Sequence, residues 1–395
     1  MKTTVLGLSV LGLGVLGLGV LLSSCDTVFT GSREPGSPIS LIVLDKRANN
    51  YVFRRLNFED TSGTDRLQLK LVSTGSPFTT TPIGLQASQG GNRLYLGFTD
   101  RIVFYTDEEK FGEPLAAPKL ADQTCSIQNF RVNDAETYLA GLVSCGDPQN
   151  VTQQKLWVHS LLSGGTDVLL DNPIPNDQPI TVAGSPSSLG YGVFPYVLTD
   201  KQLFFVKNII GDTTSSYLYT LALNTTPLAL PIGYVPEKVV AVNTLSTASL
   251  NTDTGPATVG GLAVTRDGVY RIEDSGKLGG KLLPEPYKAL WSVSTSALKS
   301  VALWNPDLSV NFNRTLRFFN GSSSPTVNTQ GAVRDLTFAP ATGNAYYLDT
   351  SSLVQVDVSS PPVNNSYRSL SQDYASLGLE NPISIGWILT NTSQK

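Results

Sequence analysis

The stretch DLTFAPATGNAYYLDTSSLVQVDV, residues Asp335–Val358, decides the fold class. In its second half, Leu353–Val358, the three valines share one face of an extended chain, while Gln355 and Asp357 share the other. A period of two with one apolar face is typical of a half-buried antiparallel strand. The apolar run Ala345–Leu348 comes just before it across a short polar turn, so the stretch predicts a strand pair.

The same form, an apolar run, a short polar turn and another apolar run, recurs along the chain. Arg93–Phe98 pairs in this way with Arg101–Tyr105, and Leu262–Val264 with Gly268–Ile272. Asp267-Gly268 at the second of these turns is a hairpin signal. From Ile39 onward the apolar runs are short and rich in Val, Tyr, Phe, Leu and Thr, with no amphipathic helical period, so the chain is predicted to be all-β.

The strand pairs group into units that begin near residues 39, 83, 124, 179, 238, 288 and 331. A spacing of about 40–55 residues suits four-stranded blades. We therefore expect a single β-propeller of about seven four-stranded blades, with six and eight as alternatives. Ile383–Leu389 is predicted to return to Ile39–Leu44 and so close the ring. The competing architecture is two β-sandwiches in series.

Two segments resemble a known family. Asp335–Leu348 is similar to the start of a blade in TolB-like or surface-layer-type propellers, where an apolar strand, a Pro-x-x-Gly turn and a Tyr-rich strand follow one another. Val132–Ala140 is similar in outline. The Trp-Asp pair of WD40 repeats and the Asp-box of sialidase-type propellers are absent from the sequence. The resemblance implies a propeller but no activity, because propellers host many unrelated functions.

The amino-terminal segment has the form of an export signal. Lys2 is followed by the apolar run Val5–Leu22 and then by small residues. Leu22-Ser23-Ser24-Cys25 resembles the lipobox of bacterial lipoproteins, which implies cleavage before Cys25 and a lipid attached to its sulfur. The alternatives are an ordinary signal peptide and a membrane helix with an incidental cysteine.

The resulting division of the chain is a signal peptide over residues 1–24, the lipidated Cys25 and a flexible tether over 25–38, and the propeller over 39–395. The expected location is the bacterial cell envelope, outside the cytoplasm, and the first expected partner is the membrane that holds the lipid.

Cys125 and Cys145 are expected to form a disulfide, because paired cysteines are common outside the cytoplasm. Ser126–Val132 and Thr137–Ser144 are predicted to form a hairpin around the turn Asn133–Glu136. A hairpin centred on Ala135 places the two cysteines opposite each other. The alternative is two separate buried thiols.

Composition bears on the partner class. The formal net charge is −4, and charged residues make up 15% of the chain. No run of Lys or Arg is long enough to follow a phosphate backbone, so nucleic acid is not expected as a partner.

Motif searches assign no catalytic residue, metal ligand or cofactor. The one histidine, His159, lies in an alternating strand segment, and the sequence has no GxSxG, HExxH or CxxC motif. The Gly-rich segment Gly184–Tyr196 carries Tyr191, Phe194 and Tyr196, which would suit ligand contact if the segment were an exposed loop. The alternative is that these aromatic rings pack beneath the loop as a local core.

The favoured function is a membrane-anchored binding or scaffolding module for an envelope protein or a polysaccharide. The alternative is an envelope enzyme, a hydrolase or lyase, that uses carboxylates at the mouth of the propeller channel. A structural envelope protein without a discrete ligand is the third hypothesis.

Overall fold

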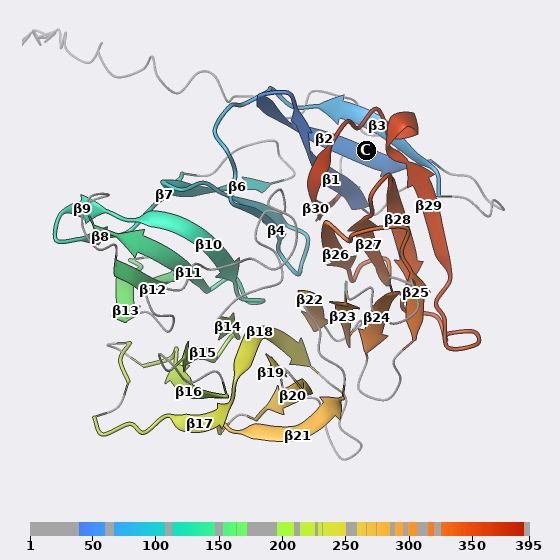
Figure 1. Cartoon of the computed structure of the whole chain (residues 1–395). Coiled ribbons are helices and arrows are strands. Elements are labelled where there is room, and N and C mark those ends of the chain that lie inside the picture. Colours follow the sequence, from blue (N-terminus) through green and yellow to red (C-terminus); the bar gives the residue numbers. More distant parts are fainter. Residues whose placement is uncertain are drawn as a thin grey trace, which may run out of the picture.

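The computed structural model describes residues 39–59, 67–106, 113–146, 153–162, 164–171, 196–208, 214–225, 228–230, 232–249, 259–265, 267–273, 275–284, 289–294, 299–305, 315–319 and 325–390. These residues form seven four-stranded antiparallel sheets, which are the blades of a β-propeller (Figure 1). The lipobox, the predicted signal and the predicted tether lie outside the described residues. No helix in the described part of the chain has the length and apolar character needed to span a bilayer.

The blades are numbered along the chain, and the strands of each run from the centre of the ring to its rim. Blade 1 consists of β30 (Pro382–Leu389), β1 (Ile39–Arg47), β2 (Asn50–Phe58) and β3 (Leu69–Thr74). Blade 2 consists of β4 (Gly84–Ala87), β5 (Arg93–Gly97), β6 (Arg101–Thr106) and β7 (Leu115–Ala116). Blade 3 consists of β10 (Ser126–Val132), β11 (Tyr138–Cys145), β12 (Gln153–Ser160) and β13 (Asp167–Asp171). Blade 4 consists of β14 (Tyr196–Leu198), β15 (Gln202–Asn208), β16 (Ser215–Ala222) and β17 (Glu237–Val240).

Blade 5 consists of β18 (Val242–Ser249), β19 (Val259–Thr265), β20 (Gly268–Ile272) and β21 (Leu278–Leu283). Blade 6 consists of β22 (Ala289–Ser294), β23 (Lys299–Asn305), β24 (Thr315–Phe319) and β25 (Thr326–Asn328). Blade 7 consists of β26 (Asp335–Ala339), β27 (Asn344–Leu348), β28 (Ser352–Asp357) and β29 (Ser369–Asp373), followed by the single 3-10 turn η1 (Tyr374–Leu377). A small hairpin, β8 (Lys119–Leu120) and β9 (Gln123–Thr124), lies between blades 2 and 3.

The core lies between the blades. Seven clusters of buried apolar side chains occur among the described residues, and each joins two neighbouring blades. Leu142 of blade 3 packs in this way with Leu203 of blade 4. Val354 and Val356 are buried in such a core, and Gln355 between them is partly exposed. This accounts for the alternation of apolar and polar residues in the sequence of the strand. The blades therefore stabilise one another through apolar burial, the main favourable contribution to folding.

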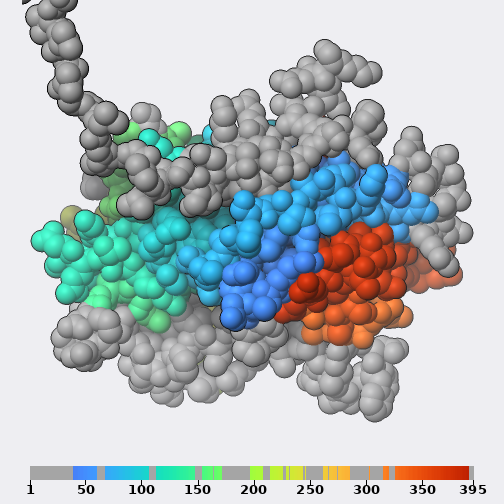
Figure 2. Space-filling model, turned by 90° about the horizontal axis from the view of Figure 1, so that it is seen from above, coloured from blue at the N-terminus to red at the C-terminus, as the bar shows by residue number. Residues whose placement is uncertain are grey.

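The ring is closed by pairing of the two ends of the chain. β30 pairs antiparallel with β1 from Ile39↔Leu389 to Asp45↔Pro382, as predicted. In the view along the rim in Figure 2, the teal, blue and red blades accordingly follow one another without a break between the first and last parts of the chain. Closure removes the open edge that β1 would otherwise present.

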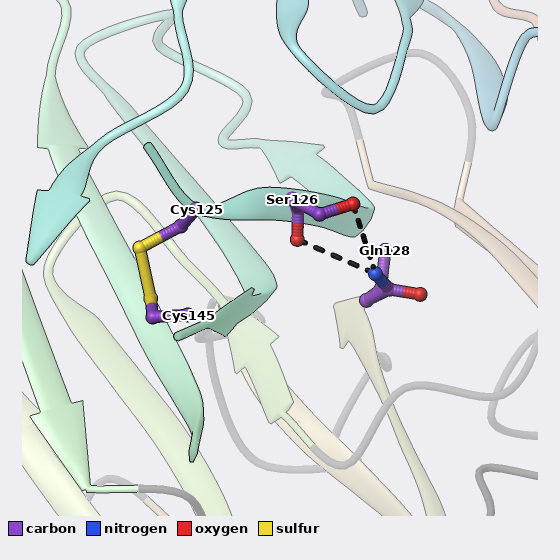
Figure 3. The surroundings of a disulfide bond; sticks show 4 residues. All are labelled: Cys125, Ser126, Gln128 and Cys145. Atoms are coloured by element: carbon purple, nitrogen blue, oxygen red, sulfur yellow. Dashed lines mark hydrogen bonds between the residues drawn. A yellow bond between two sulfur atoms is a disulfide. The ribbon is translucent and has the colours of Figure 1, made fainter. Parts of the chain in front are cut away.

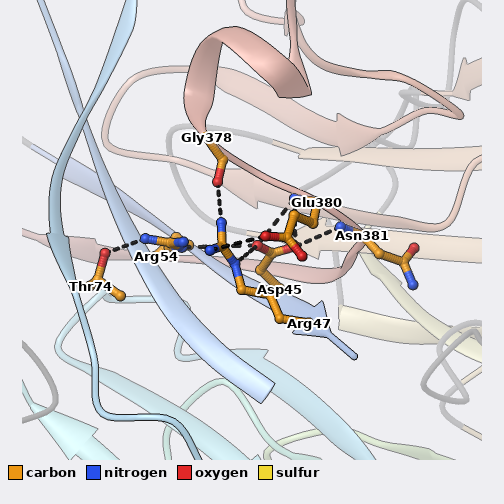
Figure 4. A network of polar contacts seen from close by, with 7 residues as sticks. All are labelled: Asp45, Arg47, Arg54, Thr74, Gly378, Glu380 and Asn381. Carbon is orange, nitrogen blue, oxygen red and sulfur yellow. Dashed lines mark hydrogen bonds and ion pairs between the residues drawn. The ribbon is translucent and has the colours of Figure 1, made fainter. Parts of the chain in front are cut away.

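A buried carboxylate fastens this closure (Figure 4). The side chain of Asp45 is fully buried, and its Oδ1 accepts hydrogen bonds from the backbone N–H groups of Glu380, at 3.1 Å, and Asn381, at 2.8 Å. Its Oδ2 lies 3.1 Å from Arg47 Nε and 3.9 Å from Arg54 Nε. The Arg54 side chain is 8% exposed. This burial, together with the nearby Arg47, lowers the pKa of its guanidinium.

Strand direction gives the propeller two distinct ends. Within a blade the chain reverses at every strand, so the turns after the first and third strands lie at one end of the disc. The turn after the second strand and the connection to the next blade lie at the other end. Ile39 begins a second strand and Leu389 ends a first strand. Both therefore lie at the same end, which we call the termini face; the other end is the opposite face.

The predicted fold, blade count and closing strand are confirmed, and so is the hairpin Arg93–Phe98 with Arg101–Tyr105, within one residue at each strand end. The predicted unit boundaries lie within four residues of the first strands of blades 2, 3, 5, 6 and 7, and the boundary near residue 39 coincides with the start of β1, the second strand of blade 1. The boundary near residue 179, for blade 4, lies outside the described residues, and the first described strand of that blade begins at Tyr196. Two sandwiches in series are excluded, because β1 and β30 share one sheet and cores join all neighbouring blades.

Candidate functional site

Three turns of blades 2, 3 and 4 meet on the termini face. They follow the first strand of each blade, the strand nearest the centre of the ring. The turn of blade 3, Asn133–Thr137, lies in the middle, with Gln89 of blade 2 on one side and Asp200 of blade 4 on the other. These turns bring together three carboxylates, those of Asp134, Glu136 and Asp200.

The middle turn is shaped by Asn133. Its side-chain Oδ1 accepts hydrogen bonds from the backbone N–H groups of Thr137, at 2.9 Å, and Tyr138, at 2.8 Å. An asparagine that binds the backbone a few residues ahead is a common turn former. Glu136 adopts a left-handed conformation with φ of 54°, which completes the reversal.

Asp200 ties blade 4 to this turn. Its Oδ1 accepts hydrogen bonds from Asn133 Nδ2 and from the backbone N–H of Ala135, both at 2.8 Å. The neighbouring Glu136 ties the turn to blade 2, because its Oε2 accepts a hydrogen bond from the Tyr95 hydroxyl at 2.6 Å and lies 3.4 Å from Arg93 Nη1. Burial, together with this carboxylate, raises the pKa of Tyr95 above its usual value. Both carboxylates are therefore engaged in joining blades.

Asp134 is the most perturbed carboxyl group in this cluster. Burial raises its pKa, and the nearby carboxylate of Asp200 raises it further, to about 7, against a smaller lowering by a hydrogen bond with Gln89. A carboxyl group that titrates near neutrality can act as a general acid or base. Among the described residues, no group of three or more His, Cys, Asp or Glu side chains is placed to hold a metal ion.

Replacement of Asp134 by asparagine is expected to flatten the pH dependence of stability. A folded-state pKa near 7 and an unfolded value near 4 mean that the folded protein keeps a proton that the unfolded chain has released. The free energy of unfolding should therefore fall as pH rises from about 4 to about 7, by roughly 1–2 kcal/mol once partial exposure is allowed for.

Asp134→Asn should remove this decline in denaturant unfolding curves recorded between pH 4 and pH 8. Asp122→Asn, at an exposed acid, is the matched control and should follow the wild-type curve. Parallel curves for the wild type and Asp134→Asn would contradict the role assigned to Asp134.

A second feature, on the opposite face, is the projecting hairpin β8–β9. Lys119 pairs with Thr124 and Leu120 with Gln123. The two residues between the strands, Ala121 and Asp122, have φ of 48° and 67°. Positive φ at both positions is typical of a type I′ hairpin turn, and it is strained for alanine. Strained backbone that the surrounding structure maintains is a recurrent property of functional sites.

The base of this hairpin is fixed by the disulfide Cys125–Cys145 (Figure 3). Both cysteines are buried, and the Cys125 backbone N–H donates to the Pro118 carbonyl at 2.8 Å. Leu120 packs against the core between blades 2 and 3, while Ala121–Thr124 are exposed. The hairpin is thus a firmly held element with a polar, solvent-facing tip.

The disulfide was predicted from sequence and is present in the structure. The register Ser126↔Ser144 extends by one residue to place Cys125 opposite Cys145. A register shift between Ile127 and Asn129 moves the rest of the hairpin by one residue. The predicted strand Ser126–Val132 has the observed bounds.

The aromatic segment before blade 4 is only partly described, because Tyr191 and Phe194 lie outside the described residues. For Tyr196 the structure excludes the ligand-contact interpretation and agrees with the alternative, a local core. Its side chain is 1% exposed, and its hydroxyl donates to Asn129 Oδ1, at 2.9 Å, or to the Ala140 carbonyl, at 3.2 Å. Tyr196 thus belongs to the core between blades 3 and 4, where no ligand can reach it.

His159 has a structural environment. Its Nδ1 lies 2.8 Å from Asp167 Oδ1, which also accepts a hydrogen bond from Trp157 Nε1 at 2.7 Å. These contacts lower the pKa of Asp167, the largest cause being the hydrogen bond with His159. The side chain of His159, the only histidine in the sequence, therefore links β12 to β13, the two outer strands of blade 3.

Comparisons with known proteins identify no family for this chain. No family model matches the sequence, and neither does any curated protein. Similar solved structures include the periplasmic gluconolactonase PpgL of Pseudomonas aeruginosa, which is 12% identical with a TM-score of 0.46 over 89% of this chain and 99% of that chain. Apo AztD from Citrobacter koseri is 12% identical, with a TM-score of 0.44 over 89% of this chain and 98% of that chain.

A putative TolB from Agrobacterium tumefaciens is 10% identical, with a TM-score of 0.38 over 74% of this chain and 90% of that chain. At these identities the likenesses concern the fold and carry nothing about ligand or activity.

Sequence reasoning missed the group around Asp134. It recognised Asn133–Glu136 as a turn, but Asn133 and Asp200 are 67 residues apart. Their meeting depends on which end of which blade each turn occupies, and no local pattern carries that information.

Proposed function

We propose that this chain is a lipid-anchored, extracytoplasmic binding module of the bacterial envelope, and that the β8–β9 hairpin contacts an envelope protein. The observation that carries the proposal is the position of the chain ends. Ile39 lies on the termini face, so a tether that starts at Cys25 joins the propeller there. The opposite face, with its projecting hairpin, is then the face presented away from the membrane.

The contacts of the hairpin suit a protein partner. Its base is covalently fixed, so binding requires little ordering of the chain, and ordering is one of the main costs of association. The exposed Lys119, Asp122 and Gln123 offer charge and hydrogen bonds of the kind found at interface rims. The disulfide at the base suits a compartment outside the reducing cytoplasm.

The lipid anchor is tested by replacing Cys25. Cys25→Ser removes the sulfur to which a lipid would be attached, so the protein is expected to leave the membrane fraction or to accumulate unprocessed. Thr27→Ser, a similarly small change two residues further on, should leave membrane retention intact. The measurement is immunoblotting of membrane and soluble fractions after a high-salt wash. Full membrane retention of Cys25→Ser would contradict the anchor.

The binding face is tested by photo-crosslinking in intact cells. A photoreactive residue at Asp122, on the opposite face, should capture a reproducible envelope protein. The matched position is Asn224, which is exposed in the turn after β16 on the termini face. Capture from Asn224 alone, or from neither position, would contradict a partner at the hairpin.

A second candidate function is an envelope hydrolase or lyase at the mouth of the channel. The specific observation in its favour is the raised pKa of Asp134 beside Asp200. Turnover of an envelope polysaccharide by the wild type, abolished in Asp134→Asn, would establish it. Equal turnover by the two proteins would remove it.

A further inference from the structure

We infer that the termini face rests on a lipid surface, with apolar side chains of the turns between third and fourth strands entering the bilayer interface. This inference rests on the proposed lipid anchor at Cys25, and it concerns how the anchored propeller is oriented. The occupant of the apolar surface is the membrane itself.

The first step is the location of the exposed apolar residues. Five large apolar side chains are exposed among the described residues: Leu162, Ile232, Val235, Val240 and Val363. Four of these, all except Val240, lie in connections between the third and fourth strands of blades 3, 4 and 7. Such connections lie on the termini face. Isolated apolar residues are ordinary on a protein surface, but their concentration on one end of a disc calls for an explanation.

The second step is the way in which the most exposed of these residues are held. Ile232 and Val235 are 107% and 83% exposed, and they flank Tyr234. The Tyr234 hydroxyl accepts a hydrogen bond from the Thr220 backbone N–H at 2.8 Å, and its ring stacks on Tyr219 at 6.1 Å. The Tyr234 side chain therefore ties this segment to blade 4, while the side chains of Ile232 and Val235 remain exposed.

Val363, 73% exposed, is held in a similar way. Its backbone exchanges two hydrogen bonds of 2.9 Å with Ser366, and Ser366 Oγ donates to the Thr326 carbonyl at 2.9 Å. Exposed apolar side chains on such a fixed segment are suited to insertion into a bilayer interface, because the chain does not have to become ordered when they enter it.

The third step is the low charge around these tips. The connections over residues 161–166 (LLSGGT) and 223–236 (LNTTPLALPIGYVP) contain no Asp, Glu, Lys or Arg, and the connection over 358–368 (VSSPPVNNSYR) contains one charged residue, Arg368. The corresponding connections of blades 1 and 2, residues 59–68 and 107–114, are acidic. The three connections that carry the tips thus hold a single basic residue between them, which fits a neutral lipid surface better than an anionic one.

The fourth step is the reach of the tether. The 14 residues of 25–38 precede the first described strand. They extend over at most about 50 Å, and a flexible chain of this length has a root-mean-square span of about 20 Å. Since the tether joins the disc on the termini face, this face stays within reach of the bilayer, where even weak insertion is favoured by the high effective concentration.

The test uses the mature lipidated protein in phosphatidylcholine vesicles with brominated acyl chains, which quench nearby tryptophan fluorescence. Ile232→Trp is the probe, and Val240→Trp is the matched control, because Val240 is exposed on the same blade but pairs with Ser215 at the start of β16, toward the opposite face. Residues that enter the interface lie about 5–10 Å into the headgroup region, so bromination should remove about half of the added Ile232→Trp emission. The added Val240→Trp emission should be unchanged.

When the protein has been shown to be in the vesicles, equal quenching of the two probes, or quenching of neither, would overturn the inference. Failure of the purified protein to enter vesicles at all would instead overturn the lipid anchor on which the inference rests. Both substitutions are at exposed side chains, and unchanged unfolding midpoints in denaturant confirm that the fold is retained.

Discussion

Replacing Asp45 by alanine is expected to lower the free energy of unfolding by about 3–5 kcal/mol, the cost of removing one partner from a buried ion pair. The change leaves the backbone N–H groups of Glu380 and Asn381 without their acceptor. It also leaves the buried Arg54 without its nearest carboxylate. The measurement is denaturant unfolding, with a lower midpoint and an unchanged slope expected.

Two further variants test whether the loss of stability comes from the buried contacts of Asp45 or from the removal of any acidic side chain. Asp373→Ala removes an exposed carboxylate whose side chain caps no helix, and its effect should stay within about 0.5 kcal/mol. Asp45→Ala combined with Arg54→Met should cost less than Asp45→Ala with Arg54 in place, because no uncompensated charge stays buried. A larger loss in the double variant would show that Arg54 stabilises the fold through other contacts.

Removal of the disulfide is expected to cost about 3 kcal/mol on a chain-entropy model. Cys125 and Cys145 are 20 residues apart, so the bridge restricts a substantial loop of the unfolded chain. The double variant Cys125→Ala with Cys145→Ala should unfold at lower denaturant, and reductant should produce the same decrease in the wild type. Reductant should have no effect on the double variant.

The bridge also bears on binding, because it fixes the base of the β8–β9 hairpin. In the same double variant, photo-crosslinking from Asp122 should decline even under conditions where the propeller stays folded. Alkylation of either cysteine in the unreduced wild-type protein would contradict the bridge.

Much of the fold could be predicted because propeller strands carry local signals. The alternation of Val354 and Val356 with Gln355 follows directly from a sheet with one face against the next blade. The closing strand was predictable because Ile383–Leu389 is strongly apolar and needs a buried place in a sheet. β30 finds that place beside β1, and every residue of it except Leu389 is buried.

The features that escaped prediction depend on contacts between blades. Tyr196 follows a Gly-rich segment, and such a pattern does not reveal whether an aromatic ring points into the core or into solvent. Its hydroxyl contacts, Asn129 and the carbonyl of Ala140, belong to blade 3, far back along the chain. Asp134 escaped for the same reason, because its raised pKa arises from burial among turns of three blades.

Ring closure by β30 has a consequence for the order of events in biosynthesis. Asp45 contacts a residue 335 positions later in the chain, so blade 1 cannot be completed until almost the whole polypeptide has been made. Synthesis from the amino end delivers β1 early and β30 last. During that interval β1 can pair with β2 but its other edge is open, and an open apolar edge is a site for aggregation. The ring can therefore close only once the carboxyl-terminal strand is available.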